Sequence, residues 1–383
     1  MKRTITLFLY FILFLTYSST AQRRIYVNEY LNIGVGARGL SLAGSQAAMA
    51  NDVTAAYWNP AGLMQVKSDL EIGGMHAEYF SGNAKYDYLA VAKPLKNKDR
   101  VVAFSALRFA IDDIPNTIDY VQPDGSFDES KLKSLSAGDY AFLFSYAQKL
   151  KLFKKDTLFR TTVGGNAKII YRHLGRMANA WGFGIDAGIQ TRYKQWLFGI
   201  MAKDITTTYT SWSFHLSERE KQVFGQTGNE IPVKSYELMY PRLNFGVARS
   251  LLKPGGKIQV TTELGVDMTT DGNRNTLIHT NAVSFDPHLG VEASYQNAIF
   301  LRLGIGNYQR ALDDEDTSNT QKILIYQPSV GVGFNIGIFN LDYAFTSLQT
   351  QANPLFTHII SLRVNLSAPD RKVSTNTPPP AKK

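Results

Sequence analysis

The sequence predicts an all-β protein, a 14-stranded antiparallel transmembrane β-barrel with an N-terminal plug segment in its lumen. Three observations lead to this fold class. The first 21 residues have the layout of an export signal, residues 22–67 do not alternate, and the chain from about residue 68 alternates apolar and polar residues with period 2. We therefore divide the chain into a signal peptide (1–21), a plug (22–67), an outer-membrane barrel (68–367) and a tail (368–383).

The predicted signal peptide has a basic start, Lys2 and Arg3, followed by an apolar run from Ile5 to about Tyr17. Small residues precede a cleavage point between Ala21 and Gln22. The run is shorter than the about 20 residues that a membrane helix needs, so we expect export. The chain has 20 Tyr, 22 Phe and no Cys, which excludes disulfides and sulfur-ligated metals and is typical of a bacterial outer-membrane barrel.

The barrel prediction depends on segments that are long enough for a tilted membrane strand, about 9–11 residues. In segment 180–193, Trp181 and Phe183 lie on one face, and Gly182 and Asp186 lie on the other. An apolar face opposite glycines and charges, with no helix to cover either, favours lipid outside and a polar lumen over a soluble sandwich. Fourteen such segments fall near 68–80, 86–95, 100–114, 137–150, 158–175, 180–193, 195–206, 237–250, 257–270, 286–296, 298–308, 323–336, 338–349 and 356–367.

The connections between these segments alternate in length. Long excursions at 115–136, 207–236, 271–285 and 309–322 alternate with short turns, as expected for external loops and periplasmic turns. The short turns are basic, whereas the long loops contain acidic runs such as Asp313–Asp316. We expect an integral outer-membrane location with both termini in the periplasm. The Pro-rich basic tail, 368–383, is predicted to be disordered there.

The predicted plug begins with the pattern G-x-G-x-x-G at Gly34–Gly39, which is typical of dinucleotide-binding turns. Such a site needs an acidic residue about 20 positions further on, but no Asp or Glu occurs from Val53 to Ser68. Export also separates the segment from the nucleotide pool, so we expect no nucleotide. The glycines are instead interpreted as a compact start of the plug, where small residues let the backbone approach the barrel wall.

A second motif of the plug is "AYWNPAGL" at Ala56–Leu63. Asn59 can cap a turn by bonding two residues on, Pro60 fixes its own φ, and Gly62 tolerates φ > 0. Trp58 is expected to anchor this turn against the barrel wall.

With these motifs, the stretch "GARGLSLAGSQAAMANDVTAAYWNPAGL" resembles the N-terminal hatch signature of FadL-type barrels, and more closely that of the PorV/PorQ group of Bacteroidota outer-membrane proteins. In that family an N-terminal plug precedes a 14-stranded barrel. The resemblance implies a non-enzymatic type IX secretion component or accessory that binds translocon or cargo proteins. The plug motif consists of Gly34, Gly36, Arg38, Gly39, Gly44, Asn51, Asp52, Trp58, Asn59, Pro60, Ala61 and Gly62.

Two other functions stay open at this stage. One is a FadL-like outer-membrane transporter of hydrophobic compounds. A lumen of glycines and charges argues against a large apolar pocket, although Tyr209, Trp212 and Phe214 could form an outer apolar site. The other is a structural barrel with a different dedicated partner.

The sequence indicates no catalytic residue, metal site or cofactor, and no nucleic-acid partner. Six scattered His residues have no metal-binding spacing, and Asp313–Asp316 lacks the remaining spacing of a calcium loop. Beyond membrane lipid, the expected partners are proteins. Arg38 is expected to pair with Glu263 or Asp267. The charges of the lumen that are candidates to pair with the plug are Asp186, Glu263, Asp267, Glu292, Arg302, Asp342 and Arg363.

Overall fold

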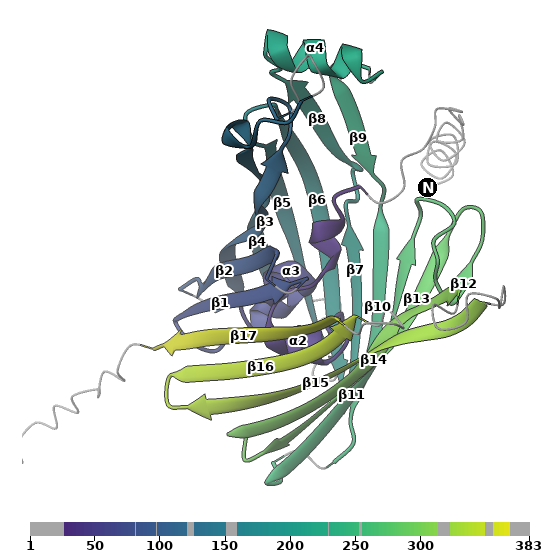
Figure 1. Cartoon of the computed structure of the whole chain (residues 1–383). Coiled ribbons are helices and arrows are strands. Elements are labelled where there is room, and N and C mark those ends of the chain that lie inside the picture. The colour runs from purple at the N-terminus through teal and green to yellow at the C-terminus, as the bar shows by residue number, and fades with distance from the viewer. Residues whose placement is uncertain are drawn as a thin grey trace, which may run out of the picture.

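The computed structural model describes residues 27–367, except 81, 97, 121–125, 151–158, 229, 253–254, 313–321 and 349–354. In this part of the chain, seventeen strands join in one antiparallel sheet, which closes because β1 pairs with both β2 and β17 (Figure 1). Fourteen strands form the wall, so the predicted 14-stranded barrel is confirmed. The signal peptide with its cleavage point, the Asp313–Asp316 run and the tail lie outside the described residues.

Every wall strand overlaps one of the predicted segments. The wall strands are β1 (Leu70–Tyr79), β2 (Ala84–Pro94), β3 (Arg100–Asn116), β4 (Lys133–Leu150), β5 (Phe159–Leu174), β6 (Ala178–Tyr193), β7 (Trp196–Lys203), β10 (Arg242–Ser250), β11 (Ile258–Thr269), β13 (Ser284–Tyr295), β14 (Ile299–Leu312), β15 (Lys322–Ile336), β16 (Phe339–Leu348) and β17 (Leu355–Leu366). None of the helices in the described residues has the length and apolar character that a membrane crossing needs.

The alternation places apolar side chains on the outside of the barrel. On β6, Trp181 and Phe183 are 52% and 61% exposed, whereas Asp186 on the same strand is 3% exposed. In a soluble protein, charged side chains face the solvent and aromatic rings are buried. Here the charge is buried in the lumen and the aromatic rings face outward. The distribution fits a wall with lipid outside, because a bilayer solvates apolar side chains and not charged ones.

The predicted loop 207–236 is not a loop throughout, because β8 (Thr208–Phe214) continues the course of β7 along β6, and β9 (Ser235–Met239) precedes β10. Between β7 and β8 the chain leaves the ladder, and Asp204 and Thr207 have positive φ values. This interruption breaks the period-2 pattern, which is why the sequence pattern ends there. Helix α4 (Glu218–Gln226) joins β8 to β9, and Figure 1 shows all three above the rest of the barrel.

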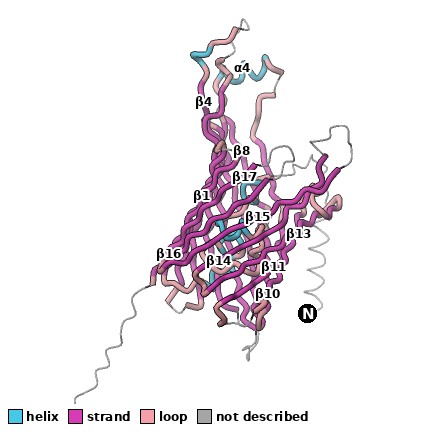
Figure 2. Tube along the Cα trace, turned by 60° about the horizontal axis from the view of Figure 1, so that its bottom comes forward, coloured by secondary structure: helices cyan, strands magenta, loops and turns pink. Residues whose placement is uncertain are grey.

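Short elements also occur in the other predicted loops. A 3-10 turn, η3 (Glu129–Lys131), precedes β4, and β12 (Ile278–His279) pairs with the start of β13. Figure 2 shows the β4 and α4 regions as the tallest part of the molecule. An ion pair between Arg219 on α4 and Asp119, 3.8 Å apart, joins the two projections.

The N-terminal segment, residues 27–66, lies in the lumen (Figure 2). It contains η1 (Glu29–Asn32), α2 (Ala37–Ser41), α3 (Ala55–Trp58) and η2 (Pro60–Gln65). Its Val35, Val53 and Leu63 are fully buried, in one apolar cluster with wall residues such as Tyr86 and Leu107. The helices are too short to be stable alone, so packing against the wall determines their conformation.

Eight glycines on eight wall strands face the N-terminal segment, and we call this row the glycine girdle. A Cβ atom at any of them would come within 3.0 Å of an atom of residues 41–61. Three pairs of these glycines are direct cross-strand partners: Gly164 with Gly188, Gly199 with Gly246, and Gly290 with Gly304. The girdle consists of Gly73, Gly164, Gly188, Gly199, Gly246, Gly290, Gly304 and Gly331. The wall therefore has no side chains where the N-terminal segment approaches it most closely.

The two ends of the described chain lie at opposite ends of the barrel. Glu29 contacts Arg242 and Arg274, which lie at the loop end. The segment then runs down the lumen to Gln65, which contacts Gln190 near the turn end, where β1 also begins and β17 ends. The chain termini themselves lie outside the described residues, so the expectation that both are periplasmic stays a prediction.

Candidate functional site

The glycines of the first motif pack mainly against Trp58 rather than against the barrel wall. Gly34, Gly36 and Gly44 have φ values of 99°, 79° and 79°, a region that residues with a Cβ rarely adopt. A Cβ at Gly39 would come within 2.6 Å of the Trp58 Nε1 atom. Trp58 itself donates a hydrogen bond to the Val35 carbonyl at 2.9 Å. The expectation that Trp58 anchors the turn against the wall is corrected: its ring packs on the glycine motif.

The Asn59-Pro60-Ala61-Gly62 turn joins the segment to the wall. The Asn59 side chain accepts a hydrogen bond from the Ala61 amide at 3.2 Å, two residues on, and donates to the Ala47 carbonyl at 2.7 Å. Gly62 does not have a positive φ. Position 62 requires glycine for another reason: a Cβ atom there would overlap the Ala50 carbonyl group. Pro60 begins η2 and lies against Gly164 of the girdle.

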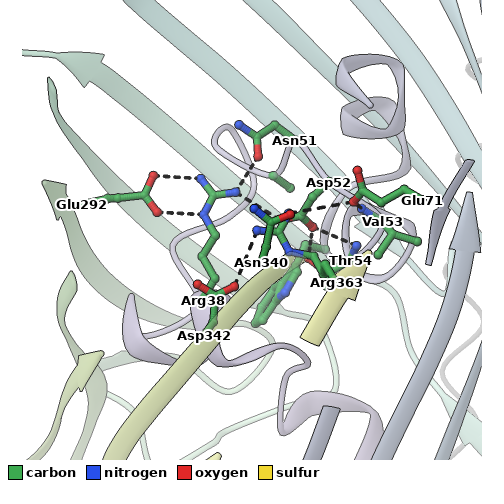
Figure 3. A network of polar contacts seen from close by, with 12 residues as sticks. Arg38, Asn51, Asp52, Val53, Thr54, Glu71, Glu292, Asn340, Asp342 and Arg363 are labelled. Carbon is green, nitrogen blue, oxygen red and sulfur yellow. Dashed lines mark hydrogen bonds and ion pairs between the residues drawn. The ribbon is translucent and has the colours of Figure 1, made fainter. Parts of the chain in front are cut away.

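Arg38 forms the strongest polar contact between the segment and the wall (Figure 3). Its guanidinium donates two parallel hydrogen bonds to Glu292, at 2.8 and 3.0 Å, and further bonds to Asn51 and Asp52. Such bidentate, charge-assisted pairs are among the strongest polar contacts in proteins. The expected partners, Glu263 and Asp267, are wrong for Arg38, because α2 directs this side chain toward β13 and β14 instead.

The Arg38–Glu292 pair belongs to a chain of alternating charges. Arg302 contacts both Glu292 and Asp342 at 2.7 Å. Arg363 contacts Asp342 at 3.5 Å and Asp52 of the segment at 3.0 Å. Burial alone would raise the pKa of Asp52, but Arg363 and Arg38 together hold this pKa well below its usual range. The network binds the segment to β13, β14, β16 and β17.

Glu263 and Asp267 hold a different part of the segment. Glu263 is fully buried and accepts hydrogen bonds from the backbone amides of Ala48, at 3.2 Å, and Met49, at 2.7 Å. Asp267 is linked to the segment through His288. The His288 ring bonds the Ser45 hydroxyl at 2.8 Å through Nδ1 and Asp267 at 3.3 Å through Nε2.

The Ser45, His288 and Asp267 side chains are of the types that form nucleophile–base–acid relays. The Ser45 hydroxyl, however, belongs to a residue that is 0% exposed, so no substrate can reach it. The bridge is therefore structural. Sequence reasoning missed Ser45 and His288 because they lie 243 positions apart and match no motif.

Asp186 does not contact the N-terminal segment. It pairs with Lys168 at 3.1 Å and accepts a bond from the Asp204 amide at 2.9 Å. This cluster connects β5 and β6 to the backbone at Asp204, where β7 ends and the chain turns toward β8. Of the seven predicted lumen charges, Glu292, Arg363 and Glu263 contact the segment directly; Arg302 and Asp342 act through other wall charges.

A cavity of about 960 Å³ lies between the N-terminal segment and the loop end of the wall, and we call it the outer cavity. Its lining includes apolar side chains, Ile33, Leu40 and Trp58 from the segment and Tyr79 and Phe109 from the wall. The volume is within the range of about 300–1,000 Å³ that is typical of ligand sites. A lumen of glycines and charges therefore still leaves room for a partly apolar site, because the glycines lie at the girdle below it.

The loop aromatics proposed as an outer apolar site are not part of this lining. Tyr209 is 43% exposed on the outer face and stacks on Tyr236. Trp212 stacks on Phe214 and lies under the Arg172 guanidinium at 5.0 Å. Within the described residues, no three His, Asp or Glu side chains converge to hold a metal ion.

No family model matches the chain, and no curated protein matches it. Among solved structures, the fold is similar to "CymD monoaromatic hydrocarbon channel", with a TM-score of 0.52 and 12% identity over 88% of this chain and 98% of that chain. It is also similar to the P. putida toluene transporter TodX, with a TM-score of 0.51 and 12% identity over 88% and 99%. At this identity the likeness shows the barrel fold alone, and no comparison bears on PorV or PorQ.

Proposed function

We propose that this protein is an outer-membrane barrel that admits a small compound with an apolar part from the loop side into its lumen. The outer cavity is the observation that supports this function. It has the volume of a ligand site, and Trp58, Tyr79 and Phe109 give it aromatic surface. The structural neighbours include proteins titled as a hydrocarbon channel and a toluene transporter. The transport hypothesis thereby takes precedence over the type IX secretion hypothesis.

The proposal assigns the N-terminal segment a gating role. The segment lies directly under the outer cavity, and the glycine girdle and the Arg38 network hold it against the wall. A compound in the cavity contacts the segment through Leu40 and Trp58, so its binding can favour one position of the segment over another. A ligand shifts such an equilibrium only as far as it binds the two positions differently.

Trp58 provides a direct test, because it is one of only four Trp residues and lines the outer cavity. A variant with Trp181, Trp196 and Trp212 replaced by Phe retains Trp58 as the single indole. Titration with toluene or another small aromatic compound should change its emission in a saturable way. The matched control is Trp58→Phe with the other three indoles intact, in which saturable change should be absent.

Native mass spectrometry of the gently extracted protein gives an independent measurement. We expect a small compound to be retained and to be lost in a variant with Leu40→Gln, which makes the cavity floor polar. No saturable Trp58 response to any small compound, together with an empty protein, would contradict the proposed function.

A protein-partner role, as the resemblance to PorV and PorQ implies, is a second candidate. The observation in its favour is the projection formed by β3, β4, β8, α4 and β9, which carries exposed apolar side chains: Phe127 is 69% exposed, Val233 77% and Tyr236 60%. Affinity capture with the wild type and with a variant in which Gly-Ser residues replace 216–230 tests this role. Capture of secretion proteins by both chains alike would count against the projection as the contact surface.

A further inference from the structure

The lining of the outer cavity has an apolar part, an uncharged polar part and a charged part, and these differences bear on the class of compound that it takes. The inference rests on the proposed function and narrows it. One wall is apolar: it consists of Ile33, Leu40 and Trp58 from the N-terminal segment with Tyr79 and Phe109 from β1 and β3. Flat aromatic surfaces of this kind bind the apolar faces of rings.

A second wall is polar and uncharged. It comes from β14, β15 and β16, and its side chains are Asn307, Gln309, Gln327, Ser329 and Thr346. Some of their hydrogen-bonding capacity is used between them: Asn307 donates to Gln327 at 3.1 Å, and Gln327 donates to Thr346 at 2.7 Å. Each amide and hydroxyl group can form more bonds than these. A purely apolar ligand would desolvate this wall without replacing its hydrogen bonds to water, which is unfavourable.

The cations of the cavity are already paired, so they are not available to an anionic ligand. Arg172 contacts Asp139 at 2.7 Å and Glu237 at 3.2 Å. Arg242 and Arg274 each contact Glu29 at 2.9 Å. Among the described residues that line the cavity, every Arg has such a carboxylate partner. A carboxylate ligand would have to displace one of them.

We propose that the outer cavity binds a neutral compound that joins an aromatic or alkyl part to a polyhydroxylated ring, such as an aryl or alkyl glycoside. The apolar part and the C–H face of the ring lie against Trp58 and Tyr79. The hydroxyl groups, each a donor and an acceptor, bond the amides of Gln309 and Gln327. A volume of about 960 Å³ accommodates a ligand of this size.

The test uses the full chain, extracted in an amine-oxide detergent, because detergents with sugar heads would compete. The single-indole protein with Trp58 is titrated with 4-nitrophenyl β-glucoside, toluene, decanoate and glucose. We expect the glycoside to bind at least about tenfold more tightly than any of the other three. Gln327→Leu and Gln309→Leu should each weaken glycoside binding about tenfold and should not weaken toluene binding, because an apolar ligand then has less polar surface to desolvate. Gln222→Leu on α4, outside the cavity, is the matched control.

The outcomes separate this inference from the proposed function. Tighter binding of toluene or decanoate than of the glycoside overturns the inference and leaves the proposed function standing. Glycoside binding that neither Gln variant weakens overturns the assignment to the polar wall. If none of the four compounds changes Trp58 emission, the inference fails. If the extracted protein also retains no small compound in native mass spectrometry, the proposed function fails with it.

Discussion

Gly164→Ala tests how the N-terminal segment is held in the lumen. We call the segment seated when it packs against the glycine girdle as in this structure, and unseated when it has left the girdle. Gly164 lies on β5 in the glycine girdle, and a Cβ there would lie 2.5 Å from the Pro60 carbonyl carbon and 2.6 Å from the Ala61 nitrogen. Both atoms belong to the backbone, so no side chain can rotate away. Because ordinary van der Waals contact begins at 3.4 Å, the segment has to move by about 0.9 Å at Pro60.

The steric free-energy cost decides the size of the change. Forcing an extra carbon into a packed site costs about 1–3 kcal/mol. The restriction of the unfolded chain by Ala does not offset this cost, because Gly164 stays in the folded wall whether or not the segment is in place. The seated position of the segment should therefore lose about 1–3 kcal/mol. Since about 1.4 kcal/mol corresponds to a factor of ten, the unseated fraction should rise about 5- to 140-fold.

Limited proteolysis and single-channel conductance in planar bilayers measure this fraction. Gly164→Ala should expose residues 41–66 to protease and raise the open probability of the barrel. The control is Gly74→Ala on the outer face of β1, where the nearest atom to a new Cβ is 3.8 Å away; it should behave as the wild type. Equal protection and equal conductance of all three proteins would refute the reasoning that the girdle glycines seat the segment.

Three further predictions concern the polar contacts of the segment. Arg38→Ala leaves the buried Glu292 without one of its two Arg partners and should cost about 3–5 kcal/mol, measured as earlier release of the segment in a urea titration; an unchanged midpoint would contradict it. Glu263→Gln replaces one acceptor oxygen by an N–H₂ group, and hydrogen exchange at the Ala48 and Met49 amides should become faster, with Gln259→Leu, an exposed site on the same strand, as control. The Asp52 contribution should be independent of pH near neutrality: because its folded pKa lies below the ordinary value of 3.8, the ionised form stabilises the fold above that value, and the contribution is lost only as pH falls below it. The comparison is made with and without Asp52→Asn in a protein that carries Glu71→Gln, so that this neighbouring carboxylate does not titrate. The difference in stability should then be constant from pH 8 to about pH 5, and a decrease within that range would contradict the assignment.

The alternation of apolar and polar residues along the sequence predicted the strands of the barrel wall. A strand that separates lipid from a polar lumen has to alternate along its whole length, because successive side chains point to opposite faces. Segment 180–193 therefore predicted β6, and the same rule predicted the other wall strands. The pattern failed where the chain leaves the ladder, at Asp204 to Thr207, so β8 and β9 were taken for a loop.

The composition of residues 22–67 also predicted a compact segment in the lumen, but not how it is held. The sequence named Arg38 and the lumen carboxylates without being able to pair them. Which carboxylate Arg38 meets depends on the direction of α2 and on the register between β13 and β14, which places Glu292 opposite Arg302. The Ser45–His288 bridge was likewise invisible, because its partners come from distant parts of the chain.

The sequence by itself therefore determined the number of wall strands, the faces that they turn to lipid and lumen, and the small-residue character of the N-terminal segment. Each of these is a local property, since it follows from side chains that are neighbours along the chain. Only the tertiary structure decided that girdle glycines from eight strands meet one segment, and that Trp58, Tyr79 and Gln327 surround one cavity. Closing the barrel brings these residues together, and closure depends on strand register around the whole wall.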